Sequence, residues 1–329
     1  MIDVEYEDRK AAESRLTQPI KAPDGAAYPR EEPRETLGDY CKKLEKPYTT
    51  GVIDTVPAGV IDTATYIRRV LIPKDEYCII RVDGRAFHTF TRPYKTKDNP
   101  FCIDIIKAMR AAIDALIGEF SPAFVYSQSD EITVVIEPHK VPFGRRCHKL
   151  NSIAASVATA AFNLYLARNG LARTSKPATF DARAYGASLD DVGKVLIWRQ
   201  RDAIKNSISA AARTVYSSKQ LEGRNSDEKL SMMAEKGVRW EDYPRACTHG
   251  MIAFRTVKQV VLDPSWLREQ GTPEGVIDKI VGEGCIAMRN VTEYPDVPRF
   301  DRIANLDSVI FDHAEPLFKQ AKETTHEDI

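Results

Sequence analysis

The sequence predicts an α+β protein built around a ferredoxin-like core. Two observations carry this prediction. Apolar, β-branched runs of strand length alternate with segments of helical periodicity, and they do so in one recognisable order. From residue 76 that order is strand, helix, strand, strand, helix, strand, followed by another helix. The first six elements match the split βαβ pattern, in which the first strand and the central hairpin share one antiparallel sheet.

Each element has its own local signal. The strand over 76–82 is apolar along most of its length, which is typical of a fully buried strand. Asn169-Gly170 ends one helix, and Ser188 with Asp191 begins the next. We expect the remaining elements at these positions: strands over 123–126, 132–136, 178–185 and 251–257, and helices over 37–46, 101–118, 144–170 and 188–216.

The composition narrows the class of protein. With 47 basic and 47 acidic residues the formal net charge is zero, so nucleic-acid binding would need a local basic patch. The six cysteines form no C-x-x-C pair, which favours reduced thiols and a cytoplasmic location over a zinc site or a disulfide framework. No uninterrupted apolar run reaches the roughly 20 residues that span a bilayer, so we expect no membrane partner.

Carboxylates occupy two predicted strand ends. Asp83-Gly84 follows the first strand, and YSQSDE (126–131) places Asp130 and Glu131 at the join of the hairpin. Either motif alone is an ordinary turn, but the predicted topology can bring Asp83 beside Asp130. Two such carboxylates repel each other unless a cation lies between them, and Mg²⁺ prefers carboxylate oxygen. Paired aspartates on a sheet of this topology are typical of polymerase-type palm domains, which use two Mg²⁺ ions for nucleotidyl transfer.

Basic residues cluster near two predicted helices. Arg145, Arg146, His148 and Lys149 lie at the start of the 144–170 helix, where they oppose the helix dipole. This placement favours an anionic ligand, with a solvated basic surface as the alternative. In the helix after Ser188, spacings of three and four put Arg199, Asp202 and Asn206 on one face, with Arg213 two turns on. That face is either solvated or part of a groove.

At these residues the sequence resembles the tRNA(His) guanylyltransferase superfamily of 3′–5′ polymerases. The resemblance covers roughly residues 37–257. It is carried by these stretches: LGDYCKKLE (37–45), RVDGRAFHTFTR (81–92), YSQSDEITVVI (126–136), NSIAASVATAAFN (151–163), TFDARAY (179–185), WRQRDAIKNSI (198–208) and EKGVRWEDYP (235–244). Ile204 stands where eukaryotic members have the His of a His-Ile-Asn-Asn-Leu-Tyr motif, so the chain is most similar to the bacterial and archaeal guanylyltransferase-like branch.

The resemblance implies roles for individual residues. Asp83, Asp130 and the carbonyl of Gly84 would hold two Mg²⁺ ions, and Glu131 would support them or act as a catalytic carboxylate. A further set would bind the nucleotide: Asp83, Gly84, Arg85, Ala86, Phe87, His88, Lys95, Ser129, Asp130, Lys149 and Asn206. The expected tRNA-binding residues are Arg145, Arg146, Arg199, Lys205 and Arg213.

The function implied is Mg²⁺-dependent 3′–5′ nucleotide addition to the 5′ end of tRNA, with activation by ATP or GTP. It would act as template-dependent repair, as G addition to tRNA(His), or as both, in a homotetramer. Two alternatives stay open: a palm-type nucleotide cyclase or transferase without an RNA substrate, and a non-catalytic RNA- or nucleotide-binding module. The implied organisation has four parts: a weakly ordered arm (1–34), a palm-like catalytic domain (35–185), a helical or mixed region (186–260) and a C-terminal extension of unknown role (261–329).

Overall fold

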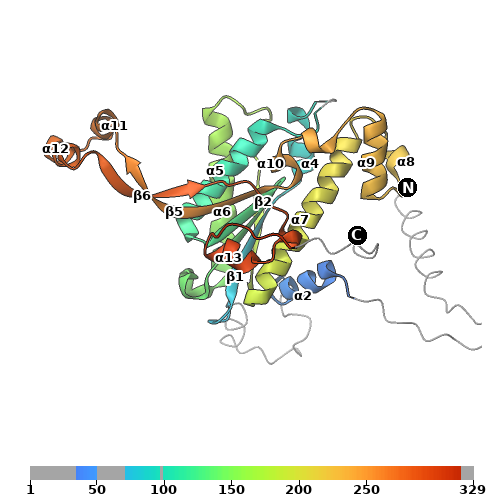
Figure 1. The fold of residues 1–329 in the computed structure, drawn as a ribbon, viewed down its shortest axis with the longest axis horizontal. Coiled ribbons are helices and arrows are strands. Elements are labelled where there is room, and N and C mark those ends of the chain that lie inside the picture. Colours follow the sequence, from blue (N-terminus) through green and yellow to red (C-terminus); the bar gives the residue numbers. More distant parts are fainter. Residues whose placement is uncertain (1–34, 50–70, 97–98, 320–329) are drawn as a thin grey trace, which may run out of the picture. The chain divides into compact units, whose positions relative to one another are not determined.

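The computed structural model describes residues 35–49, 71–96 and 99–319 (Figure 1). By its internal contacts the chain divides into two compact units, Met1–Asp39 and Tyr40–Ile329. The weakly ordered N-terminal segment predicted over 1–34 lies outside the described residues. All that follows concerns the second unit.

One six-stranded sheet forms the centre of this unit. Its order is β4-β1-β3-β2-β5-β6, and every neighbouring pair is antiparallel. The first four positions in that order are those of a ferredoxin-like sheet, so the predicted fold is confirmed. The strands are β1 (Tyr77–Gly84), β2 (Phe124–Gln128), β3 (Glu131–Ile136), β4 (Phe180–Ala187), β5 (Met251–Val261) and β6 (Ile286–Glu293).

Three long helices cover the sheet, and shorter helices join them. The long ones are α5 (Ile103–Phe120), α6 (Cys147–Arg168) and α7 (Leu189–Ala212). The shorter ones are α2 (Leu37–Thr49), α4 (Phe87–Phe90), α8 (Ser218–Leu221), α9 (Ser226–Glu235), α10 (Arg245–Thr248), α11 (Pro264–Glu269), α12 (Glu274–Gly282) and α13 (Leu306–Phe311). α6 begins three residues later than predicted, because Gly144 and Arg145 have φ angles of 61° and 63°, which no α-helix accommodates.

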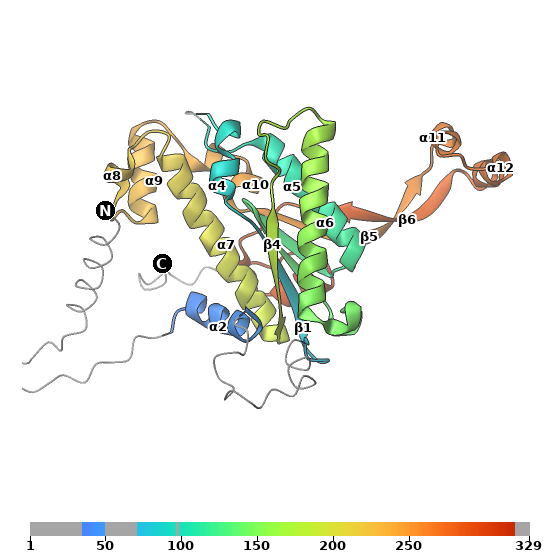
Figure 2. The same ribbon diagram turned by 180° about the vertical axis from the view of Figure 1, so that it is seen from behind.

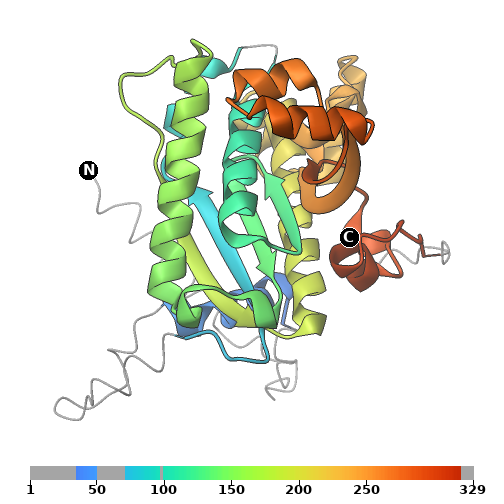
Figure 3. The same cartoon turned by 90° about the vertical axis from the view of Figure 1, so that its left-hand side faces the viewer.

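The two faces of the sheet have different covers. α5 and α6 lie side by side over one face, and α7 crosses the other (Figure 3). Alternate residues of β1, Cys78, Ile80 and Val82, point into the apolar core beneath α5 and α6. The intervening positions point toward α7, and they include Arg81 and Asp83. Two functional layers therefore arise from one alternating strand.

α6 is the one described helix that is long and apolar enough to cross a membrane by length and composition. The sequence prediction missed this property because polar residues interrupt the apolar ones. Here Leu150, Ala154, Ala158 and Phe162 of α6 are buried in the core against the sheet. These residues of α6 serve the core, and a single helix of this kind is weak evidence for a membrane span.

β5 and β6 extend beyond the helical layers as an arm, which we define as residues 255–292. β5 and β6 pair from Phe254 with Glu293 to Val261 with Ile286, and α11 and α12 lie at the far end (Figure 1). Leu262, Leu267 and Ile277 form a small separate core there. Apart from the first half of β5, no element of this arm was predicted from the sequence.

Candidate active site

Asp130 lies in a two-residue turn between β2 and β3. Gln128 pairs with Glu131 across that turn, and Ser129 has a φ of 51°, an uncommon value for a residue other than glycine. The backbone N–H of Gly84 donates a 3.1 Å hydrogen bond to the carbonyl of Asp130. The topology therefore brings the Asp83-Gly84 motif and the Asp130 turn together, as the sequence predicts.

Gly84 is required by the packing of the residue three positions on. A Cβ atom at Gly84 would lie 2.3 Å from the ring of Phe87, closer than any real contact. Phe87 is buried and packs against Phe162 and Phe180. The Phe87 ring therefore serves the core, and only its backbone is left to meet a ligand.

Burial of the two aspartates raises their pKa values. Desolvation is the main cause of the raised pKa of Asp83, and the neighbouring carboxylate of Asp181 adds to it. The pKa of Asp130 is also raised, mainly by desolvation and further by the charge of Asp83, while the Ser129 hydroxyl and Lys95 act in the opposite direction. Both carboxylates thus lie where a cation would be favourable.

Glu131 has a different environment from the two aspartates. Arg199 of α7 donates from Nε to Oε1 at 2.6 Å and from Nη2 to Oε2 at 2.7 Å, so both carboxylate oxygens are engaged. The Nη1 atom of Arg199 donates to Asp202 at 2.9 Å. Only 6% of Glu131 and 9% of Arg199 is exposed. Glu131 therefore supports the site from inside, and we leave Arg199 out of the tRNA-binding surface because its guanidinium is enclosed.

The chemistry of the donor set fits magnesium. Asp83, Asp130 and the Gly84 carbonyl offer hard oxygen ligands, and Mg²⁺ commonly uses one or two carboxylates while water and substrate phosphates complete its shell. Among the described residues, no group of three His, Cys, Asp or Glu side chains is arranged to hold a metal ion. The set therefore suits a metal that is shared with a phosphate-bearing substrate better than a closed structural site.

The start of α6 lies at the other end of the sheet. Arg146 bridges to Leu71, and Arg145 donates to the carbonyls of Ile72, at 2.8 Å, and of Glu76, at 3.0 Å, just before β1 begins. Asp83 lies near the far end of β1, about 20 Å along the strand from Tyr77.

This separation changes the interpretation of the basic residues at the start of α6 (Figure 2). Within one chain Lys149 does not reach Asp83 or Asp130, so its expected contact with the same nucleotide is corrected. Arg145 is occupied by backbone carbonyls, which removes it from the expected tRNA-binding residues. Arg146, His148 and Lys149 remain exposed at that distant end.

The second half of α7 lies at the end of the sheet that carries the carboxylates. Arg199 contacts Glu131, and the helix continues from there past the sheet edge. Lys205, Asn206 and Arg213 are exposed on this continuation. Arg85, His88 and Lys95, which follow β1, are exposed at the same end. These residues place polar and cationic groups at the same end of the sheet as the two aspartates, and the charge of Lys95 acts on Asp130.

Two nearby charged residues were not predicted. Asp181 of β4 lies opposite Asp83 in the register, with Arg183 Nη2 at 3.8 Å from its carboxylate. Arg81 lies 2.6 Å from Glu45 and 3.9 Å from Glu131. The alternation of TFDARAY and of CIIRVDG carries the signal for both, since every second residue of each strand faces α7.

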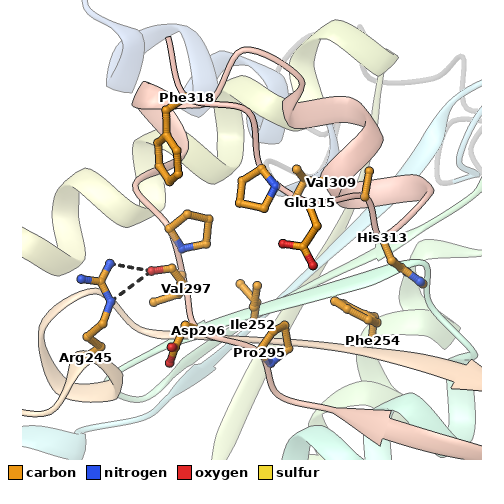
Figure 4. A pocket seen from close by; sticks show the side chains of 13 residues that line it. Arg245, Ile252, Phe254, Pro295, Asp296, Val297, Val309, His313, Glu315 and Phe318 are labelled. Atoms are coloured by element: carbon orange, nitrogen blue, oxygen red, sulfur yellow. Dashed lines mark hydrogen bonds between the residues drawn. The ribbon is translucent and has the colours of Figure 1, made fainter. Parts of the chain in front are cut away.

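A cavity of about 480 Å³ lies away from these residues (Figure 4). It forms between β5 and the segment from Pro295 to Phe318, and none of the predicted site residues lines it. Arg245 donates from Nε and Nη2 to the carbonyl of Val297 at its edge. This cavity was not predicted, because most of its walls come from residues 295–318, where no motif is recognisable.

Comparison with known proteins identifies the family. The family model described as tRNAHis guanylyltransferase matches residues 63–188. A bacterial tRNA(His) guanylyltransferase-like protein, solved in complex with ATP, is 31% identical with a TM-score of 0.52, over 67% of this chain and 88% of that one. This chain belongs to the tRNA(His) guanylyltransferase family. Members of this family are nucleotidyltransferases.

Other relatives agree with this assignment. The tRNA(His) guanylyltransferase of Debaryomyces hansenii is 30% identical over 49% of this chain and 62% of its own length. A bacterial guanylyltransferase-like protein solved in complex with GTP is 24% identical and shows a similar fold, with a TM-score of 0.53 over 81% of this chain and 94% of that one. The chain thus spans about two thirds of the length of its curated relatives.

Proposed function

We propose that this protein adds nucleotides to the 5′ end of tRNA in the 3′–5′ direction, with ATP or GTP activating that end. The observation that carries the proposal is that Asp83 and Asp130 lie close together at the ends of neighbouring central strands, in a chain of this family. The ATP and GTP complexes of the bacterial relatives support nucleoside triphosphates as substrates. Template-dependent repair and G addition to tRNA(His) are the two forms of the reaction that we consider.

Asp83, Asp130 and the Gly84 carbonyl would hold two Mg²⁺ ions in this proposal. Bound there, the ions would stabilise the negative charge that develops on the phosphate oxygens during attack. Lys95 adds positive charge beside Asp130, and the exposed residues after β1 would orient the triphosphate. Asn206 of α7 lies on the same side and is suited to contact the nucleotide or the tRNA end.

The tRNA-binding surface would consist of cationic side chains that remain accessible. Lys205 and Arg213 are exposed on the second half of α7, on the side of the sheet end that carries the carboxylates, while Arg146 is exposed at the opposite end of the sheet. A tRNA is long enough to contact both regions. Because the net charge is zero, its affinity would depend on these local patches and would fall steeply as salt is added.

We also propose that the chain forms a homo-oligomer, a tetramer by resemblance. The arm supports a contact with a second copy: one face of the β5–β6 ribbon carries Val257, Val261, Ile286 and Met288, which are 45–80% exposed. A two-stranded ribbon gains stability when such a face is covered. Light scattering after size exclusion tests this, since Val261→Lys with Met288→Lys should reduce the mass. An unchanged mass would contradict this contact.

The decisive experiment measures incorporation of labelled nucleotide onto a tRNA that lacks its first 5′ nucleotide and onto full-length tRNA(His). Each is assayed with Mg²⁺ and with a chelator. Addition that follows the opposite base identifies the repair reaction, and addition of G to tRNA(His) alone identifies the narrower reaction. Asp130→Asn should lose both, while Asp263→Asn, a matched change at the end of the arm, should retain them. No addition by a folded protein that binds nucleotide would favour the cyclase or the non-catalytic module.

A further inference from the structure

Three carboxylates form one row across the neighbouring strands β3, β1 and β4, at the end of the sheet that carries Asp83. The register places Glu131 of β3 opposite Asp83 of β1, and Asp83 opposite Asp181 of β4. Like charges in directly opposed positions of neighbouring strands destabilise a sheet. The row therefore requires specific compensation, and each member receives it differently.

Glu131 receives most of the compensation. The guanidinium of Arg199 holds both of its oxygens, at 2.6 and 2.7 Å, in the two-pronged geometry that gives strong charge-assisted hydrogen bonds. Arg199 is in turn fixed by Asp202 at 2.9 Å and lies over the ring of Trp198, 4.5 Å from its centroid. Asp181, by contrast, is exposed, with Arg183 only within 3.8 Å.

Glu131 is also the neighbour in sequence of a proposed metal ligand. It follows Asp130 directly, and its side chain shares the α7 face of the sheet with that of Asp83. Its own carbonyl accepts a 2.9 Å hydrogen bond from the hydroxyl of Ser127, and with Gln128 it closes the turn that carries Asp130. Fixing Glu131 therefore fixes one end of that turn.

We propose that Arg199 is a positioning residue for the metal site. It holds the Glu131 carboxylate against α7. Through Glu131 it also anchors the turn that presents Asp130. This inference rests on the proposed function, because it assigns Asp83 and Asp130 to a metal.

A purely structural role predicts a different behaviour. Buried ion pairs are weak contributors to stability, and replacing both partners by apolar residues of similar size is often neutral or stabilising, whereas removing one partner is costly. If the Arg199–Glu131 pair served only the fold, a variant with both residues replaced would have wild-type stability and wild-type Mn²⁺ affinity. If it positions the turn, replacement restores the fold but not the metal site.

The test compares Mn²⁺ binding with thermal unfolding in the full chain. Bound Mn²⁺ is measured by electron paramagnetic resonance without nucleotide, and unfolding is followed by circular dichroism without metal. The double variant Glu131→Met with Arg199→Met should unfold near the wild-type temperature but bind Mn²⁺ about 10–100-fold more weakly. Arg199→Lys keeps the charge and loses the two-pronged geometry, so it should fold and also bind Mn²⁺ more weakly, and it tests the proposal if the double variant does not fold.

A matched pair controls for the loss of any ion pair. Arg268 and Glu274 at the end of the arm form a two-pronged contact of similar geometry, at 2.8 and 3.2 Å, on the exposed surface. Replacing both by Met should leave Mn²⁺ affinity unchanged. Folded Arg199 variants with wild-type Mn²⁺ affinity would overturn the positioning role alone, provided that Asp130→Asn abolishes binding. If the wild type binds no Mn²⁺, or Asp130→Asn binds it equally well, the metal assignment itself fails and the positioning role fails with it.

Discussion

The two faces of the central sheet are organised by different forces. Beneath α5 and α6, alternate strand residues join a core of aliphatic and aromatic side chains. Beneath α7, the alternate positions of the same strands carry Arg81, Asp83 and Glu131. Burial of apolar surface is favourable and non-directional, whereas a buried charge is tolerated only with well-placed partners.

This contrast separates stability from chemistry. The apolar face supplies a rigid base for the sheet. The α7 face carries carboxylates whose pKa values are raised because the fold disfavours their charge. Such groups cost stability, and a site that binds cations gives a physical reason to retain them.

The largest expected effect is on the α7 face. Asp130→Ala should lower the rate of nucleotide addition by at least ~10³-fold. The change removes a proposed ligand of the metal ions that would stabilise the transition state. The fold should remain, since the residue lies in a turn. Steady-state incorporation and circular dichroism measure the two effects, and near-normal turnover by the folded variant would refute the assignment.

On the apolar face the expected effect is on stability. Phe162→Ala should lower the free energy of unfolding by about 3–5 kcal/mol, because it opens a cavity among Phe87, Phe90 and Phe180. Urea unfolding measures this loss. At a temperature where the variant is folded, its kcat should match that of the wild type. A stable variant with a low kcat would show that the two faces are not separate.

His249 should make the stability of the protein depend on pH. Burial, together with Arg245 and Arg299, lowers its pKa from 6.5 to about 4. The unfolded chain therefore binds the proton more readily, so stability is complete above pH 6.5 and falls as the pH drops toward 4, by up to about 3 kcal/mol. Thermal unfolding between pH 7 and 4 should show a steeper loss in the wild type than in His249→Gln. Equal slopes would contradict this role.

The raised pKa of Asp130 makes stability change with pH in the opposite direction. The folded state holds this proton more tightly than the unfolded chain, so its contribution to stability falls as the pH rises from the ordinary value of 3.8 through the raised pKa. Asp130→Asn should therefore stabilise the metal-free protein at neutral pH by about 0.5–2 kcal/mol.

Added Mn²⁺ should then raise the unfolding temperature of the wild type but not that of Asp130→Asn. Calorimetry of both proteins with metal and with a chelator checks both statements. A less stable Asn variant would show that the carboxylate is well compensated without a cation.

The sequence predicted those features that depend on local pattern. Strand and helix periodicity specified the order of the core, and that order brought Asp83 to Asp130. The ends of β2 and β3 were missed because Gln128 and Glu131 are polar, and the partner that allows Glu131 to be buried, Arg199, is 68 positions away. No local pattern reveals such a pair.

Another error arose because the predicted topology was not used to place the start of the helix that follows β3. Lys149 was assigned to the nucleotide through the family resemblance, by its position in the sequence. In the predicted order, however, the helix after β3 must begin at the end of the sheet opposite to Asp83. The arm from 255 to 292 was missed because its apolar residues alternate over short segments and remain exposed, which gives a weak pattern.

The smallest effect concerns RNA binding on the α7 side. Lys205→Ala should weaken tRNA binding modestly and reduce the slope of log Kd against log salt by about 1, because it removes one phosphate contact. Lys107→Ala, an exposed lysine of α5 on the other side of the sheet, is the matched control and should leave the slope unchanged. Filter binding over a series of salt concentrations measures both. If Lys107 changed the slope and Lys205 did not, the RNA would lie over the apolar-core face, and the division of labour between the two faces would have to be reversed.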